Sequence, residues 1–121
     1  MRYMMMVYDQ ETRWTETTPE EMGKLMEEFN AFHADIMAGG NLLVAERLHP
    51  TQTATTVRVK EGKALITDGP FAETKEQLGG VYVFECKDLD EAIELASTIP
   101  TARTGSIEIR PVFLPPDEEG M

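Results

Sequence analysis

Two segments of the chain are apolar at consecutive positions rather than at alternating ones. In the segment 2–8, every residue after Arg2 is hydrophobic. In the segment 81–86, the first four residues are hydrophobic. Successive side chains of a strand point to opposite faces, so a strand in either segment has two apolar faces that need cover. Helices can cover one face, and the two helices predicted below leave nothing for the other. The pattern therefore predicts a homodimer that buries the second face of a sheet.

Two amphipathic helices are predicted. The first begins with Thr18-Pro19-Glu20-Glu21, a capping box with proline at the first helical position, and should run to Ala38 before Gly39-Gly40. Apolar residues recur along it at helical spacing, at Met22, Leu25, Met26, Phe29, Phe32, Ile36 and Met37. The second begins at Asp88-Leu89-Asp90-Glu91, another capping box, and ends at Pro100.

The remaining elements are shorter strands. Residues 41–47 and 106–110 are predicted as single strands, and residues 55–59 and 64–67 as a hairpin around Glu61-Gly62-Lys63. The order β-α-β-(hairpin)-β-α-β predicts a ferredoxin-like α+β fold, with an antiparallel sheet and two helices on one face. We expect one domain over residues 1–112, followed by an acidic, proline-rich tail at residues 113–121.

Composition narrows the class of protein. The 121 residues suit one domain with a hydrophobic core, and the single Cys86 excludes an internal disulfide, which fits a reducing cytoplasm. The net charge of −11 argues against nucleic-acid binding. Neither a membrane-spanning run nor a signal peptide is evident, and no zinc spacing or dinucleotide fingerprint occurs. We expect a cytoplasmic protein that needs no metal or cofactor.

The segment from Thr67 to Gly80 is the most informative. It contains Asp68-Gly69-Pro70, in which glycine tolerates unusual backbone angles and proline fixes its own φ. Asp68 is thereby held at a rigid strand end, where functional sites are often built.

The run Asp-Gly-Pro-Phe-Ala-Glu-Thr-Lys-Glu-Gln-Leu-Gly-Gly at residues 68–80 resembles the DGPF, or YCII-related, domain family. The opening Arg2-Tyr3-Met4-Met5 and the ending at residues 107–112 extend the resemblance to roughly residues 2–112. It implies a dimeric, ferredoxin-like α+β barrel that dimerises through its sheet. Family members resemble small bacterial proteins often encoded beside extracytoplasmic-function sigma factors. A His/Asp pair has been suggested as a site for the wider family.

His33 is the leading catalytic candidate because it lies near the centre of the first helix's apolar stripe and should point at the sheet. Asp68 is its predicted partner, since a carboxylate would orient the imidazole and raise its basicity for general-base catalysis. Two alternatives remain open. His33 can be a structural histidine, and the Asp68 carboxylate can accept backbone N–H groups in its own turn.

Four further residues are predicted to bind substrate. Tyr8 and Trp14 can line a cleft at the end of the first strand, Arg47 can bind a carboxylate in bidentate fashion, and Phe71 can form a pocket wall. Edge packing for Trp14 and a surface ion pair for Arg47 are the alternatives.

Two functions follow. The first is a cofactor-free enzyme for acid–base chemistry on a small molecule, of isomerase or lyase type. The second is a non-catalytic ligand-binding or regulatory module linked to a sigma factor. A cavity that joins His33 and Asp68 would favour the enzyme, and solid packing there would favour the module.

Overall fold

The computed structural model describes residues 1–115, so the last six residues of the predicted acidic tail lie outside the described part. The strands are β1 (Arg2–Asp9), β2 (Leu42–Arg47), β3 (Thr55–Lys60), β4 (Lys63–Asp68), β5 (Gln77–Glu85) and β6 (Ser106–Pro111). The helices are α1 (Thr12–Glu16), α2 (Pro19–Gly39) and α3 (Leu89–Ser97), with short 3₁₀-helices η1 (Thr51–Thr53) and η2 (Pro100–Arg103). The predicted α+β class and antiparallel plan are confirmed.

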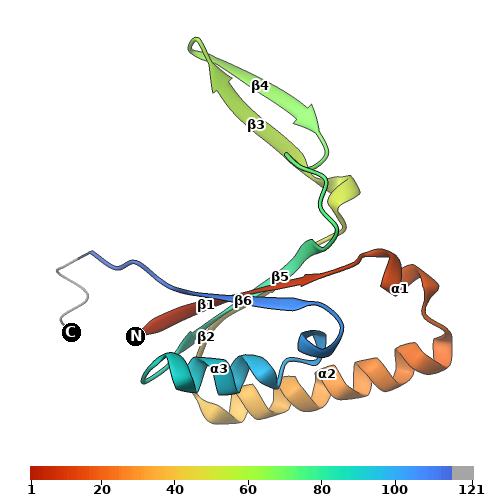
Figure 1. Ribbon diagram of the computed structural model, residues 1–121, viewed down its shortest axis with the longest axis vertical. Coiled ribbons are helices and arrows are strands. Elements are labelled where there is room, and N and C mark those ends of the chain that lie inside the picture. Colours follow the sequence, from red (N-terminus) through yellow and green to blue (C-terminus); the bar gives the residue numbers. More distant parts are fainter. Residues whose placement is uncertain (116–121) are drawn as a thin grey trace.

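Four strands form an antiparallel sheet in the order β2-β5-β1-β6, and α2 and α3 lie on the same face of it (Figure 1). The central strands β1 and β5 are the two segments that are apolar on both faces. A β-bulge interrupts their pairing, because Val7 pairs with Gly80 while Tyr8 pairs with Leu78. A bulge of this kind bends the strand and re-aims the side chains beside it.

The two long helices begin as their sequences predict, and α2 also ends as predicted, whereas α3 ends at Ser97, before the predicted stop at Pro100. The Thr18 side chain accepts a hydrogen bond from the Glu21 amide at the start of α2, and Gly40 ends the helix in the left-handed conformation with φ of 75°. The Asp88 side chain caps α3 in the same way through the Glu91 amide. Local capping therefore sets the helix boundaries, and packing on the sheet supplies most of the stability.

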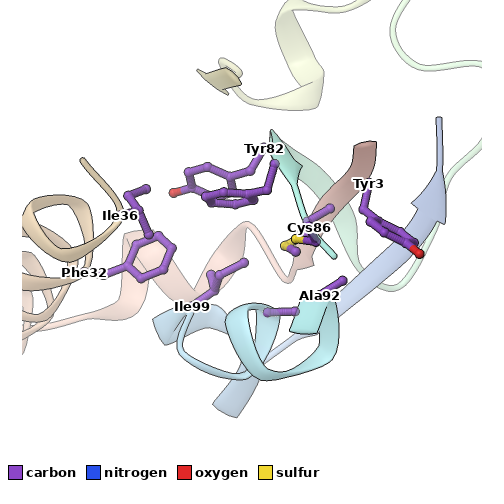
Figure 2. Close-up of a cluster of buried hydrophobic side chains, with 10 residues drawn as sticks. Tyr3, Phe32, Ile36, Tyr82, Cys86, Ala92 and Ile99 are labelled. Carbon is purple, nitrogen blue, oxygen red and sulfur yellow. The ribbon is translucent and has the colours of Figure 1, made fainter. Parts of the chain in front are cut away.

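The hydrophobic core lies between the sheet and these helices (Figure 2). Met5 and Phe84 are fully buried on the two central strands, and Phe32 and Ile36 reach them from α2. Ala92 and Ala96 let α3 lie close to the sheet because their side chains are small. Alternation in β1 places Met5 inward and therefore places Met4 and Met6 on the opposite face.

Strands β3 and β4 form a separate two-stranded hairpin that projects from the body of the molecule (Figure 1). Its turn has positive φ at Glu61 and Gly62, which matches the right-handed twist of the flanking strands. At the other end Gly69 has φ of 95°, as the Asp68-Gly69-Pro70 turn predicts.

One strand boundary needs correction, and three short helices were not predicted. β5 begins at Gln77, four residues before the predicted start, because pairing with β1 and β2 carries Gly79 and Gly80 into the sheet despite their low strand propensity. The helix α1 was not predicted, since five residues are too few to show helical periodicity. The 3₁₀-helices η1 and η2 were also not predicted. Among the described helices, none is both long and apolar enough to cross a membrane.

Candidate functional site

A cavity of about 780 Å³ opens between the first half of α2 and the sheet. Its walls come from the end of β1, α1, α2, the end of β2, the loop after β2 and the start of β5. The apolar lining consists mainly of Val7, Trp14, Met22, Met26, Phe29 and Ile99. Polar side chains, among them His33, His49, Asn30 and Arg47, are interspersed in this mostly apolar surface. Such a mixture is typical of a small-molecule site in which polar groups fix the orientation of the ligand.

His33 and Tyr82 face each other across one wall of this cavity. His33 Nε2 lies 3.0 Å from the Tyr82 hydroxyl, and both residues line the cavity. Tyr82 is buried on β5, whereas His33 is exposed overall. The ring thus points at the sheet, as its place in the apolar stripe of the helix predicts, and it is also accessible from the cavity. No other hydrogen bond to the His33 ring occurs within residues 1–115, so Nδ1 is available to a ligand.

Aromatic rings hold the His33 imidazole in place. Phe32 lies 5.6 Å from it between ring centroids, and Phe29 and Tyr82 each lie 6.2 Å away. Trp14 continues the series, with its ring 6.3 Å from that of Phe29. Tilted contacts at such distances are favourable. The rings thus form an arc that joins α1, α2 and β5.

Arg47 closes the cavity on the side of β2. Its guanidinium carbon lies 5.3 Å from the centroid of the Trp14 ring, which is a cation–π contact. In the pairing of β2 with β5, Ala45 lies opposite Tyr82 and Arg47 lies opposite Gly80. Arg47 is two residues after Ala45, so its side chain is on the same face of the sheet as that of Ala45. The arginine charge and the phenol therefore lie on the same face of the sheet.

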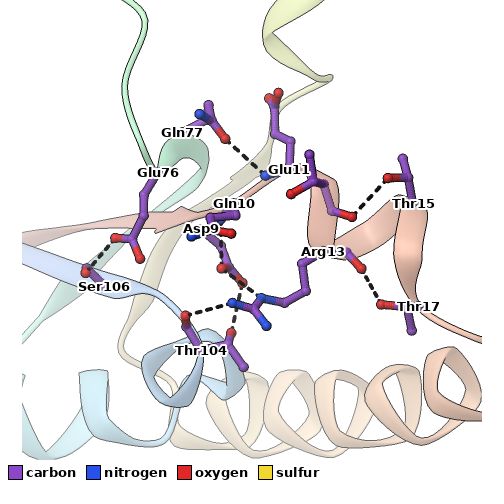
Figure 3. A network of polar contacts seen from close by, with 11 residues as sticks. Asp9, Gln10, Glu11, Arg13, Thr15, Thr17, Glu76, Gln77, Thr104 and Ser106 are labelled. Atoms are coloured by element: carbon purple, nitrogen blue, oxygen red, sulfur yellow. Dashed lines mark hydrogen bonds and ion pairs between the residues drawn. The ribbon is translucent and has the colours of Figure 1, made fainter.

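A polar network holds α1 against the sheet at the cavity (Figure 3). The Asp9 carboxylate is only 8% exposed and accepts hydrogen bonds from the Gln10 amide, Arg13 Nε and Thr104 Oγ1 at 2.8, 3.1 and 2.8 Å. Arg13 also donates to the Thr104 carbonyl. Since Arg13 is on α1 and Thr104 precedes β6, the network fixes the helix that carries Trp14.

A second contact fixes the loop after β2. The Glu11 carboxylate accepts hydrogen bonds from the backbone N–H and the hydroxyl of Thr51, at 2.7 and 2.8 Å. The Glu11 amide donates to the Gln77 side chain at 3.0 Å. The rim of the cavity is thus tied to β5 as well as to η1. Charge-assisted bonds of this type are the stronger class of protein hydrogen bonds.

Burial raises the pKa of the Tyr82 phenol above its ordinary value of 10.0, and the positive charge of Arg47 opposes this effect more weakly. The phenol is therefore neutral at physiological pH and can donate to His33 Nε2 or accept from it. A group whose pKa is raised by folding contributes stability below its unfolded pKa and loses that contribution as the pH rises through its folded pKa.

The raised pKa of Tyr82 predicts a loss of folding stability at alkaline pH, and this loss should be smaller in Tyr82→Phe. Above pH 10.0 the unfolded chain ionises Tyr82 more readily than the folded chain does, so the folded state loses stability. Tyr82→Phe should lose less stability than the wild type between neutral and strongly alkaline pH. Urea unfolding at both pH values measures the difference, and an equal loss in the two proteins would contradict it.

The structure brings three of the predicted site residues together and leaves three elsewhere. His33, Trp14 and Arg47 line the cavity. Tyr8 lies where β1 pairs with β5 and β6, and Asp68 ends β4 in the projecting hairpin, on the side of the molecule away from α2 in Figure 1. Phe71 is 78% exposed. None of these three is among the cavity residues.

Within this chain the hydrogen-bond partner of the His33 ring is Tyr82 rather than Asp68. The predicted pairing of His33 with Asp68 therefore stays a prediction. Tyr82 was not singled out beforehand as a site residue. Residues 81–84 are apolar at every position, so their pattern does not reveal which of them face the helices. The available signal was chemical, since a tyrosine hydroxyl in a buried strand requires a hydrogen-bond partner.

No group of three or more His, Cys, Asp and Glu side chains in residues 1–115 is arranged to hold a metal ion. The cavity offers the imidazoles of His33 and His49, the phenol of Tyr82 and the guanidinium of Arg47 instead. These groups can accept a proton, donate a hydrogen bond and bind an anion.

Comparisons with known proteins cover nearly the whole chain. A family model described as the YCII-related domain matches residues 1–115. An uncharacterized protein of Rhizobium meliloti (strain 1021) is 39% identical over 116 residues, which is 94% of each chain. Both similarities extend over the sheet, the helices and the turn at Asp68, so they concern the entire fold.

Proposed function

The chain belongs to the YCII-related domain family, and within that family we propose that it is a cofactor-free enzyme for acid–base chemistry on a small organic molecule. The supporting observation is the 3.0 Å contact between His33 Nε2 and the Tyr82 hydroxyl at the wall of a mostly apolar cavity. An accessible imidazole oriented by a neutral phenol is a suitable general base.

His33 takes a proton from the bound ligand and returns it at the same or a neighbouring atom. Tyr82 holds the ring in one orientation, and its hydroxyl can also hydrogen-bond an oxygen of the ligand that gains negative charge. Return of the proton to a neighbouring atom gives an isomerisation, and return to the same atom gives exchange with solvent. An elimination results where the deprotonated ligand instead expels a leaving group, which takes up the proton from His33.

Proton exchange tests this function without knowledge of the natural substrate. The protein is incubated in D₂O with a panel of small 2-oxo and 3-oxo carboxylic acids, and proton NMR follows the loss of their C–H signals. We expect the wild-type protein to accelerate exchange in at least one compound. Compounds that bind, as measured by Trp14 fluorescence, and yet never exchange would favour the non-catalytic ligand-binding module.

We also propose that the protein is a homodimer that uses the sheet face opposite the helices. Met4 pairs with Val83 and Met6 with Val81 on that face, and Val44 follows on the neighbouring strand. No helix of the described chain lies over them (Figure 1). An apolar face of this extent is more typical of an interface than of a monomer surface.

Val44→Asp should turn the dimer into a monomer, because the new carboxylate would be buried against the partner without a counter-charge. Val44 is suitable because it is exposed within the single chain, so folding should tolerate the change. Sedimentation equilibrium measures the mass. Val59→Asp, in the projecting hairpin, is the matched control and should leave the dimer intact. A monomeric wild type at micromolar concentration would contradict the proposal.

A further inference from the structure

Arg47 is a cation at the cavity wall without an acidic partner in the described chain. The ion pairs of residues 1–115 involve Arg13, Arg103 and the N-terminus, but not Arg47. Its guanidinium lies over the Trp14 ring and makes no hydrogen bond to a described side chain or carbonyl. Five N–H donors are therefore free to meet a ligand.

The acidic residues around the cavity do not supply the missing partner. The oxygens of Asp9 accept from Arg13, Gln10 and Thr104, and both oxygens of Glu11 accept from Thr51. Glu46 directly precedes Arg47 in β2, so its side chain leaves the other face of the strand. Most other Lys and Arg side chains of the described residues also lack an ion pair, but Arg47 is the arginine that lines this cavity.

From this arrangement we infer that the ligand is a small carboxylic acid with a flat, apolar body, bound through its carboxylate to Arg47. The planar guanidinium matches a carboxylate in bidentate fashion, and the cation–π contact with Trp14 helps to hold the guanidinium at the cavity wall. The flat body of the ligand then lies along Trp14, Phe29 and the two methionines of α2 that line the cavity, Met22 and Met26, and its far end reaches the His33–Tyr82 pair. This inference names the substrate class of the proposed enzyme and rests on the same cavity.

Trp14 supplies a direct measurement, because it is the single tryptophan of the chain and lines the cavity. Benzoate and benzamide are the probes, since they share a shape and differ in charge. Titrations followed by Trp14 fluorescence, and checked by ligand NMR, should show tighter binding of benzoate. Arg47→Met should weaken benzoate binding about 10- to 100-fold, the range expected for a hydrogen-bonded charge pair, and leave benzamide unchanged.

Two further variants make the test specific. Arg47→Lys keeps the charge and loses the bidentate fork, so it should bind benzoate with intermediate affinity. Arg58→Met removes an arginine of the hairpin, outside the cavity, and should leave both probes unaffected. Added salt should weaken benzoate binding to the wild type and have little effect on Arg47→Met.

The outcomes separate this inference from the proposed function. Benzoate binding that is unchanged in Arg47→Met, or benzamide binding as tightly as benzoate, overturns the carboxylate site even if proton exchange is observed. Arg47-dependent binding of benzoate without exchange in any oxo acid supports the carboxylate site and overturns the enzyme.

Discussion

Replacing Phe84 with alanine should lower the free energy of unfolding by about 3–5 kcal/mol, the range for truncating a buried phenylalanine. Phe84 is 0% exposed in the central strand β5, and it pairs with Tyr3 on one side and Leu42 on the other. Its ring stacks on Tyr82 with centroids 5.9 Å apart. The sheet pairing prevents the backbone from closing the cavity that the change would leave.

Urea unfolding followed by circular dichroism measures this loss. Phe71→Ala is the matched control, because it makes the same chemical change at a side chain that is 78% exposed, and it should alter stability by less than about 0.5 kcal/mol. A loss below about 1.5 kcal/mol in Phe84→Ala would mean that the core is less well packed than its burial indicates. Since Phe84 adjoins Tyr82, a partly folded variant should also lose the alignment of the His33 ring.

Replacing His33 with alanine should slow proton exchange in any active oxo acid by about 100-fold or more, the usual contribution of a positioned general base. Stability should change little, because His33 is exposed to the cavity and its loss leaves only the Tyr82 hydroxyl to find another partner. NMR in D₂O gives the exchange rate, and urea unfolding gives the stability.

Asp35→Asn is the control for this variant, since Asp35 is on the same helix and does not line the cavity. It should retain the wild-type exchange rate. A structural histidine predicts the reverse pattern for His33→Ala, with exchange retained and stability lowered by about 1–3 kcal/mol for an unsatisfied partner. Tyr82→Phe should fall between these limits, because it removes the orientation of the ring and keeps the base.

Much of the fold follows from local chemistry. The capping residues Thr18 and Asp88 mark the helix starts, and Gly40 accepts the left-handed conformation that ends α2. The apolar runs identify the central strands, and Glu61-Gly62 forms the turn of the hairpin. These features depend on residues within a few positions of one another, so the sequence displays them directly.

The candidate site depends on contacts between residues far apart in the chain. The unbroken apolar run in residues 81–84 is consistent with either face of the sheet, and only the register with Met5 and Ala45 turns Tyr82 toward His33. The position of α1 also depends on distant contacts, because the helix lacks a side-chain cap. The hydrogen bonds of Asp9 hold α1 where Trp14 contacts Arg47. A single strand carries no information about its neighbours' register, so the identity of the His33 partner follows from the assembled sheet.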